Sequence, residues 1–556
     1  MSQWSTSLLP VTDPVVSWVK VAERDSGAVS GRDSDGFVPV SGSEITDLTR
    51  LAFREISHFL RSDHLEQLLQ IFNDPEASVN DRAVALDLLK NASIASGGIL
   101  PMCQDTGTAL VYARRGHMVM TDGLDYSYIE EGIRRSFSDD NLRYSQLAPL
   151  TTWTEVNTQT NLPAEIDVSF SRGAHYEFLF IAKGGGSANK TFLYQETKEL
   201  LREVVFLRFV EEKLRSLGTS ACPPYHLSLV IGGPSADYAL KTAKLGAAHA
   251  LDTLPREGSA LGHGFRDRDL EAKILKLTRD IGIGAQFGGK YFCHDVRVVR
   301  LPRHTGSLPV ALAVSCAADR QAFGRISAEG VFLEKLEKDP ARYLPDSMLI
   351  SSANSEAPEI EVNLNVSMAE ILEQLDGLEV GTRVNLSGRM IVARDLAHAA
   401  MRDVVERTGA LPEYMLKHPV YYAAPAKTPQ NYASGSFGPT TAGRMDGYVE
   451  EFQSLGGSLI MLAKGNRSAA VADACRKNSG FYLATVGGPG ALIAQENIRS
   501  LAVIDFEELG LEAVYAIDVV DFPAYVVINN QGQDLFASIG TTPIRLGPTR
   551  TADDKP

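Results

Sequence analysis

The chain has 556 residues, more than one hydrophobic core accommodates, so at least two domains are expected. Its net charge of −15 argues against a broad nucleic-acid-binding surface, which requires clustered positive charge. Five scattered cysteines do not form a disulfide framework, and no apolar run reaches the roughly 18 residues of a membrane span. The first twenty residues lack the pattern of a cleavable signal, so we expect a cytoplasmic protein without a membrane segment.

The N-terminal part predicts an arm followed by helices. Residues 1–41 mix Ser, Gly, Asp and Pro with short apolar clusters, which is typical of an arm laid over a fold or of partial disorder. Helical spacing then begins, with Ser43 as the expected N-cap, and is carried by Ile45, Leu48, Ala52, Ile56 and Phe59. A second helix is expected over Asn80–Asn91.

A glycine-rich segment, Lys183–Asn189, interrupts this pattern. Its three glycines allow backbone N–H groups to approach an anion closely, but a flexible hairpin turn is an equally good interpretation. It is not a P-loop, because the Gly-Lys-Ser/Thr ending is missing. The following residues, Gln195–Leu217, predict a helix that ends at Gly218.

Strands dominate the next part of the chain. We expect strands at His226–Ile231 and within Tyr291–Leu301, and the alternation of Val310, Leu312 and Val314 predicts another. The last of these strands ends beside Cys316, at a position where α/β proteins place their sites.

A change in composition at Lys335–Pro358, towards charge, Pro and Ser, predicts a domain linker. We therefore divide the chain into an arm (1–41), a first α/β domain (42–334), a linker (335–358) and a smaller C-terminal α/β domain (359–556). Beyond the linker, Leu396–Thr408 predicts a helix capped by Gly409, and strands are expected at Val420–Ala423, Leu459–Leu462 and Tyr482–Val486.

The cysteines fall into two groups. Cys103, Cys222 and Cys316 lie in loops or at a strand end, whereas Cys293 in a β-like run and Cys475 in an amphipathic helix are typical of packing. Three thiolates can hold Zn²⁺, although the usual paired spacing is absent, or they can hold an iron–sulfur cluster whose remaining iron is an open Lewis acid. Both alternatives remain open on spacing alone.

Seven motifs in a fixed order carry a resemblance to a known family. They are LPMCQDTGT, KGGGSANK, GIGAQFGGK, RHTGSLPVALAVSC, GRMIVARDLAH, FGPTTAGRMD and AKGN. Together they resemble the iron–sulfur (class I) fumarate hydratases over residues 45–545, in the single-chain arrangement of a cluster-binding domain followed by a smaller domain. The resemblance implies an active site between the two domains and a homodimer.

The resemblance also implies the roles of individual residues. Cys103, Cys222 and Cys316 match the ligands of a [4Fe–4S] cluster whose fourth iron takes the substrate. Thr440, Asp105 and His304 match catalytic positions. The implied substrate-binding residues are Gln104, Arg143, Gly186, Arg394, Thr441, Arg444 and Lys464.

The implied activity is reversible hydration of fumarate to (S)-malate. Arginine and lysine suit a dicarboxylate, and an open iron suits a leaving hydroxide. Thr440 needs activation to act as a base, so Asp105 is both its candidate activator and an alternative base. The alternatives are tartrate dehydration or methylfumarate hydration on the same scaffold, and an iron or redox sensor, although a sensor has no need of the substrate-facing cations.

Overall fold

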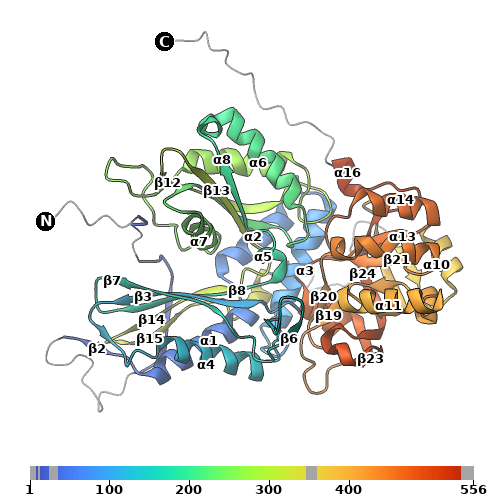
Figure 1. The fold of residues 1–556 in the computed structure, drawn as a ribbon, viewed down its shortest axis with the longest axis horizontal. Helices are drawn as coiled ribbons and strands as arrows, with labels where there is room; N and C mark the ends of the chain where they lie inside the picture. The colour runs from blue at the N-terminus through green and yellow to red at the C-terminus, as the bar shows by residue number, and fades with distance from the viewer. Residues whose placement is uncertain (1–7, 11–12, 24–35, 346–359, 540–556) are drawn as a thin grey trace, which may run out of the picture.

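The computed structural model describes residues 8–10, 13–23, 36–345 and 360–539, and their main elements form three β-sheets with helices packed against them (Figure 1). The expected two-domain α/β class is confirmed. The predicted linker lies outside the described residues from position 346 onward. In the described part of the chain, no helix has the length and apolar character needed to cross a membrane.

The first sheet has six strands among the described residues and is covered on one face by helices α1 (Gly42–His58) and α4 (Asp125–Asp139). Its strands, in spatial order, are β1 (Trp18–Ala22), β15 (Gly330–Glu334), β14 (Gln321–Ser327), β8 (Tyr176–Lys183), β3 (Thr108–Gly116) and β7 (Glu165–Ser171). Part of the predicted arm therefore pairs as edge strand β1, antiparallel to β15.

Helix α1 begins earlier than expected, and Ser43 as its N-cap is wrong. The N-cap is Ser41, whose Oγ accepts a hydrogen bond from the Glu44 amide at 3.3 Å. The Glu44 carboxylate in turn accepts from the Ser41 amide at 2.8 Å, which completes a capping box. Ile45, Leu48, Ala52 and Ile56 of the predicted apolar stripe are buried as expected, whereas Phe59 is the half-buried C-cap residue after the helix.

The second sheet has five strands in the described chain, with α7 (Ala236–Ala247) on one face and α6 (Glu203–Leu217) and α8 (Arg268–Asp280) on the other. Its strands are β11 (Phe265–Arg266), β12 (Cys293–Arg303), β10 (Tyr225–Gly233), β13 (Leu308–Ser315) and β9 (Phe192–Glu196). Every residue of β10 is buried, because helices cover both faces of this sheet. The strands predicted around His226 and Val310 and within Tyr291–Leu301 are confirmed.

The helix predicted over Gln195–Leu217 is wrong in its first third. Residues up to Glu196 form edge strand β9, which pairs with β13, and a 3₁₀ turn (Lys198–Leu201) separates it from α6. Tyr194 of this strand packs edge-on against Phe209 of α6. The tertiary pairing therefore overrides the local helical spacing.

Helices α2 (Ser62–Asn73) and α3 (Val79–Ala95) lie between the sheets and reach the C-terminal part (Figure 1). Their apolar residues share one core with the third sheet, and the ring of Phe287 stacks on Tyr525 at 4.0 Å between centroids. The two parts of the chain are thus packed through a common apolar contact.

The third sheet has seven strands in the described chain. Five of its strands are parallel: β16 (Ile360–Asn363), β17 (Arg383–Val392), β18 (Val420–Tyr421), β21 (Ile460–Ala463) and β22 (Phe481–Ala484). Strand β24 (Val514–Ile528) pairs antiparallel with β22 and β17, and edge strand β23 (Ile498–Asp505) pairs antiparallel with β24. Its helices are α10 (Met368–Leu375), α11 (Asp395–Thr408), α12 (Glu413–Lys417), α13 (Asp446–Ser454), α14 (Ala469–Asn478), α15 (Gly490–Leu492) and α16 (Leu535–Ile539). The helix predicted to end at Gly409 and the strands expected near Val420, Leu459 and Tyr482 are confirmed.

Short pairings complete the fold: β2 (Val38–Pro39) with β4 (Val119–Met120), β5 (Leu147–Pro149) with β6 (Glu155–Asn157), and β19 (Ala423–Pro425) with β20 (Phe437–Pro439). The glycine-rich segment after β8 forms a one-turn helix, α5 (Gly185–Ala188).

Candidate active site

Three loops bring Cys103, Cys222 and Cys316 together. Cys103 lies between α3 and β3, Cys222 between α6 and β10, and Cys316 directly after β13. The backbone joins two of these loops, because the Ala317 amide donates to the Cys222 carbonyl at 3.0 Å. Burial raises the pKa of the Cys222 thiol to about 11; Lys464 opposes this rise, and the thiols of Cys316 and Cys103 add to it. The three thiols therefore lie close enough to interact electrostatically.

The surroundings of the thiols fit a bound iron–sulfur group. Three soft donors converge in a mostly buried place, as such a group requires. The C-terminal part packs glycine backbone against them: a Cβ on Gly487 would lie 2.3 Å from the Cys222 Sγ, and one on Gly490 would lie 2.8 Å from the Gln104 amide. The backbone at Gly487 and Gly490 therefore lies so close to the cysteine loops that no residue with a side chain would fit there.

Asp105 is held as a carboxylate beside these cysteines. Its Oδ1 accepts from Arg143 at 3.2 Å, and its Oδ2 accepts from the Gly185 amide at 2.8 Å. Burial would raise the pKa of Asp105, but Arg143, Arg320 and Lys464 hold it below its ordinary value. The glycine-rich segment does bind an anion, and in this structure that anion is the side chain of Asp105.

The C-terminal candidates follow the carboxyl ends of three strands. Arg394 follows β17, Thr440 and Thr441 follow β20, and Lys464 follows β21. Strands β17 and β21 are parallel strands of the third sheet, so Arg394 and Lys464 lie at the same edge of it. Thr440 and Thr441 come from the separate β19–β20 pair, and Thr441 joins this edge through a β-bridge with Lys464. The Lys464 amide donates to the Thr440 carbonyl at 3.2 Å, and Arg444 donates to the Thr440 hydroxyl.

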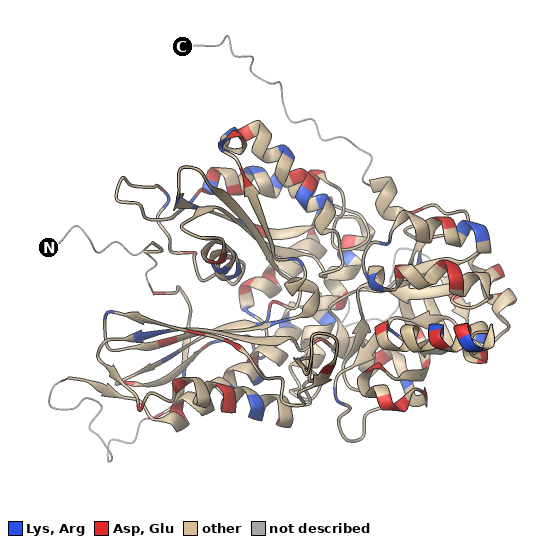
Figure 2. Ribbon diagram, in the orientation of Figure 1, with Lys and Arg blue, Asp and Glu red and all other residues tan. Residues whose placement is uncertain are grey.

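Cations from both parts of the chain converge at this edge. Burial, together with the charges of Arg143 and Arg444, lowers the pKa of Arg394 to about 10, although its ion-pair partner Glu512 opposes them. Arg444 also pairs with Asp395 at 3.1 Å. On the outer helices, by contrast, basic and acidic residues alternate (Figure 2). The positive field is therefore local to the site.

Direct hydrogen bonds join the two parts of the chain around the site. Gln104 Nε2 donates to the Pro439 carbonyl at 3.1 Å. Lys464 Nζ lies 2.9 Å from the Cys222 Sγ. Gly186 is also in this group, because a Cβ there would lie 3.8 Å from Lys464 Nζ.

His304 does not join these residues within the single chain. It is exposed on the loop that connects β12 to β13, whereas Cys316 follows the opposite end of β13. The eight residues of β13 place the two about 26 Å apart at roughly 3.3 Å per residue. The structure thus brings together all of the predicted site residues except His304.

Two further residues were not predicted from the sequence. Arg320 is 4% exposed, and its positive charge favours the ionised forms of both the Cys103 thiol and the Asp105 carboxylate, so it opposes the rise that burial causes in the pKa of each. Gln286 donates to the carbonyls of Pro223 and Gly487 and accepts from the Gly487 amide at 2.7 Å. Gln286 lies in the motif GIGAQFGGK, so the sequence could have indicated it as a site residue. No sequence pattern around Arg320 indicates a functional role.

The chain matches two family models over most of its length. Residues 46–325 match the model "Fumarate hydratase (Fumerase)", and residues 330–539 match "Fumarase C-terminus". The chain is 51% identical to "Fumarate hydratase class I, aerobic" of Escherichia coli (strain K12), over 93% of both chains. It is 52% identical to "Fumarate hydratase 2" of Leishmania major, over 90% of this chain and 87% of the relative. It is 29% identical to a putative L(+)-tartrate dehydratase subunit alpha of Methanocaldococcus jannaschii, over 51% of this chain and 99% of the relative.

Proposed function

The chain belongs to the family of class I fumarate hydratases, and from that premise we propose that it is a hydro-lyase that interconverts fumarate and (S)-malate. The observation that carries this proposal is the convergence of three cysteine thiols with Asp105 and four cations at the junction of the two parts of the chain. A hydration site for a dianion needs both a Lewis acid and fixed positive charge.

The family implies an iron–sulfur cluster, and we assign Cys103, Cys222 and Cys316 as the ligands of a [4Fe–4S] cluster. When bound, its fourth iron supplies a Lewis acid for the hydroxyl group that leaves malate. Gly487 and Gly490 leave room for the cysteine loops beside the C-terminal part. Lys464 hydrogen-bonds the Cys222 sulfur and so balances thiolate charge.

The four cations bind the two carboxylates of the substrate. Arg143, Arg394 and Arg444 offer planar, bidentate recognition, and Lys464 offers a point charge. Gln104 and Thr441 supply hydrogen bonds, and Gly186 allows the substrate to approach the backbone. The cations already face one another in this structure, so the field that attracts the dianion is preorganised.

Thr440 is the proposed base for the C3 proton of malate. A threonine hydroxyl is a poor base unless its pKa is lowered, and Arg444, which donates to its Oγ1, favours the deprotonated form. Asp105 is the alternative base, because it stays ionised beside Arg143. The variants Thr440→Val and Asp105→Asn distinguish the two candidate bases. Removing the true base slows proton abstraction, so the deuterium isotope effect on dehydration of C3-labelled malate should change in that variant and not in the other.

We further propose that the working form is a cytoplasmic homodimer in which His304 of one chain completes the site of the other. This assignment follows from the position of His304 on an exposed loop about 26 Å from Cys316 along β13. The imidazole would orient substrate or carry a proton near neutral pH. The domains proposed remain 42–334 for the cluster and 359–556 for the second part, with an arm at 1–41 and a linker at 335–358.

The decisive experiment is loss of fumarate absorbance, measured with protein purified and assayed without oxygen. Hydration that is fast, inactivated by air, restored by iron with a reductant and lost in Cys316→Ser supports the proposal. The matched control is Cys475→Ser, because Cys475 is buried in α14, in the second part of the chain. Loaded protein inert towards fumarate but active on L(+)-tartrate would favour tartrate dehydration, which the 29% identical relative suggests.

A further inference from the structure

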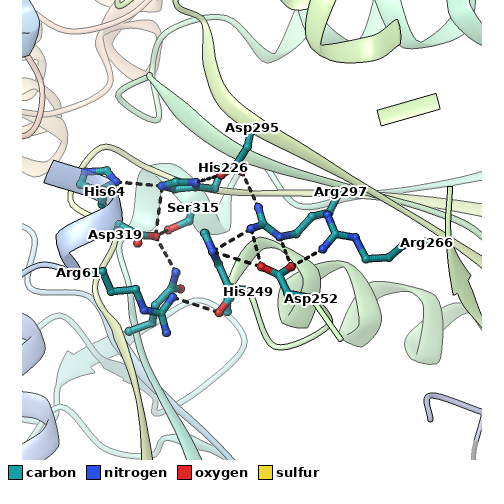
Figure 3. A network of polar contacts seen from close by, with 12 residues as sticks. Arg61, His64, His226, His249, Asp252, Arg266, Asp295, Arg297, Ser315 and Asp319 are labelled. Atoms are coloured by element: carbon teal, nitrogen blue, oxygen red, sulfur yellow. Dashed lines mark hydrogen bonds and ion pairs between the residues drawn. The ribbon is translucent and has the colours of Figure 1, made fainter. Parts of the chain in front are cut away.

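A buried chain of hydrogen bonds lies behind the loop that carries Cys316 (Figure 3). His226 of β10 bonds the Asp295 carboxylate through Nδ1 at 3.0 Å. Its Nε2 lies 2.9 Å from Nδ1 of His64 on α2, and Nε2 of His64 lies 3.0 Å from the carbonyl oxygen of Ala317. The side chains of His64 and His226 are almost fully buried, so protein groups alone decide where the protons lie.

The donors and acceptors in this row of hydrogen bonds determine how many protons His64 and His226 carry together. The Asp295 carboxylate and the Ala317 carbonyl only accept hydrogen bonds, so His226 Nδ1 and His64 Nε2 must each carry a hydrogen. A third hydrogen is needed between the two facing ring nitrogens. Two neutral imidazoles carry two N–H groups in total, and these contacts require three. The pair therefore carries one positive charge.

The surrounding groups place this charge on His226. Asp295 lies 3.0 Å from its Nδ1 and Asp319 lies 3.9 Å from its Nε2, whereas His64 faces a neutral carbonyl. Burial would lower the pKa of His226, but the two carboxylates raise it above its ordinary value. Burial lowers the pKa of His64 to about 4, which keeps that ring neutral.

Other ionisable groups also face His226 from the elements around it. Arg297 of β12 opposes its charge, but the Asp252 carboxylate, which accepts two hydrogen bonds from Arg297, offsets that guanidinium. Burial lowers the pKa of both His249, after α7, and His294, on β12, so these rings add no positive charge. The groups around His226 thus favour its imidazolium form.

A metal ion is the competing occupant of this cluster. Ring nitrogens of His64, His226 and His294 lie within 4.8 Å of one another, so they can in principle bind one ion. Each nitrogen of His64 and His226 already has a partner, however, and a metal would break the bond between the two rings. A proton between the rings of His64 and His226 accounts for these contacts, and a metal ion does not.

We propose that His64 and His226 form a permanently protonated pair, with Asp295 as its counter-ion, that positions the Cys316 loop and holds a positive charge behind the iron–sulfur group. The Ala317 peptide is fixed on both sides, since its carbonyl accepts from His64 and its amide donates to the Cys222 carbonyl. Asp319 closes the loop, because its amide donates to the Cys316 carbonyl at 2.9 Å and its Oδ1 accepts from Ser315 at 2.8 Å. His226 and Asp295 are thus positioning residues; the effect on the cluster rests on the function proposed above.

The proton itself is tested by nitrogen NMR of the full-length, cluster-loaded protein with ¹⁵N-labelled histidine, in the oxidised, diamagnetic state. We expect one ring with both nitrogens at imidazolium shifts from pH 6 to pH 9, and loss of that signal in His226→Gln. A pair without an imidazolium signal, or a stoichiometric metal ion besides the cluster iron that His294→Gln removes, would overturn the proposal. This readout does not depend on fumarate hydration, so it stands apart from a failure of the proposed function.

The positioning role is tested by the reduction potential of the cluster and the rate at which a chelator removes its iron. His226→Gln removes the buried charge, so we expect a lower potential and iron loss about 10-fold faster, as is common when an outer partner of a metal site is lost. His294→Gln is the matched control, because its ring packs against His226 but lies outside the hydrogen-bond chain. If His226→Gln fails to fold, Asp295→Asn is the second variant: without its counter-ion, His226 is expected to lose the imidazolium signal by pH 9 and the cluster to lose iron faster. An unchanged potential in folded His226→Gln, or an unchanged rate of iron loss in Asp295→Asn, would overturn this role.

Discussion

The Nζ of Lys464 lies 2.9 Å from the Sγ of Cys222, across the junction between the two parts of the chain. Burial would lower the pKa of Lys464, but the Cys222 and Cys103 thiols raise it to about 12, and Asp105 adds to this effect. One ammonium group therefore serves both the proposed cluster ligand and the proposed substrate pocket.

Replacing Lys464 should weaken both the support of the proposed cluster ligand Cys222 and the binding of substrate. We expect Lys464→Met to lower kcat/KM by about 100-fold or more, comparable to the loss of one fixed donor from an active site. The control is Lys477→Met, because Lys477 pairs with Glu450 on the exposed surface of α14. Steady-state kinetics without oxygen measure the effect, and a Lys464→Met enzyme with normal kcat/KM would contradict it.

Gly487 should tolerate no side chain. A Cβ there would lie 2.3 Å from the Cys222 Sγ, so Gly487→Ala is expected to displace this cysteine and prevent cluster loading. Gly447→Ala is the control, because a Cβ at Gly447 meets no atom within 4 Å. Iron and sulfide content after anaerobic reconstitution measures the difference. Equal loading of the two variants would show that the backbone can move away.

Lowering the pH should reduce the free energy of unfolding, because His398 in the C-terminal part is buried in its neutral form. Its ring is buried against Phe452 and Tyr422, and burial lowers its pKa to about 4. Between pH 6.5 and pH 4 the unfolded chain binds a proton here that the folded chain does not, so the stability of the fold decreases as pH falls. We expect His398 to account for about 2 kcal/mol of the loss between pH 7 and pH 5.

Urea unfolding of the full chain at both pH values tests this contribution of His398. His398→Leu should lose less stability on acidification than the wild type, and His304→Asn, at an exposed position, should behave as the wild type does. The idea fails if His398→Leu is as acid-sensitive as the unmodified chain.

The proposed role of His304 predicts complementation between inactive subunits. His304→Asn and Thr440→Val each impair every site of their own dimer, but a mixed dimer contains one site with both native residues. Random mixing should therefore restore about a quarter of wild-type activity, since half of the dimers are mixed and each has one intact site. Recovery must require subunit exchange; if none follows exchange, His304 acts within its own chain or not at all.

Much of the fold and of the candidate site follows from local patterns. The alternation of Val310, Leu312 and Val314 predicts β13 and thereby places Cys316 at a strand end, which the structure confirms. The motif around Cys103 likewise predicts a loop with a cysteine beside a carboxylate. These predictions work because side-chain periodicity and turn residues act within a few positions of the chain.

Other features depend on contacts between distant segments. Residues up to Glu196 have helical spacing but form β9, because strand β13 offers unpaired backbone groups at its edge. Arg320 has no local signal, and its role comes from its closeness to Cys103 and Asp105.

The sequence by itself determined the cysteine loops, most strands and helices, and the family of the chain, since these depend on residue order and local periodicity. The tertiary structure alone decided that Lys464 meets Cys222, that His304 lies at the far end of β13, and that His64 and His226 share a proton. Each of these results joins segments far apart in the chain. Their distances and hydrogen-bond polarity exist only once the sheets and helices have packed.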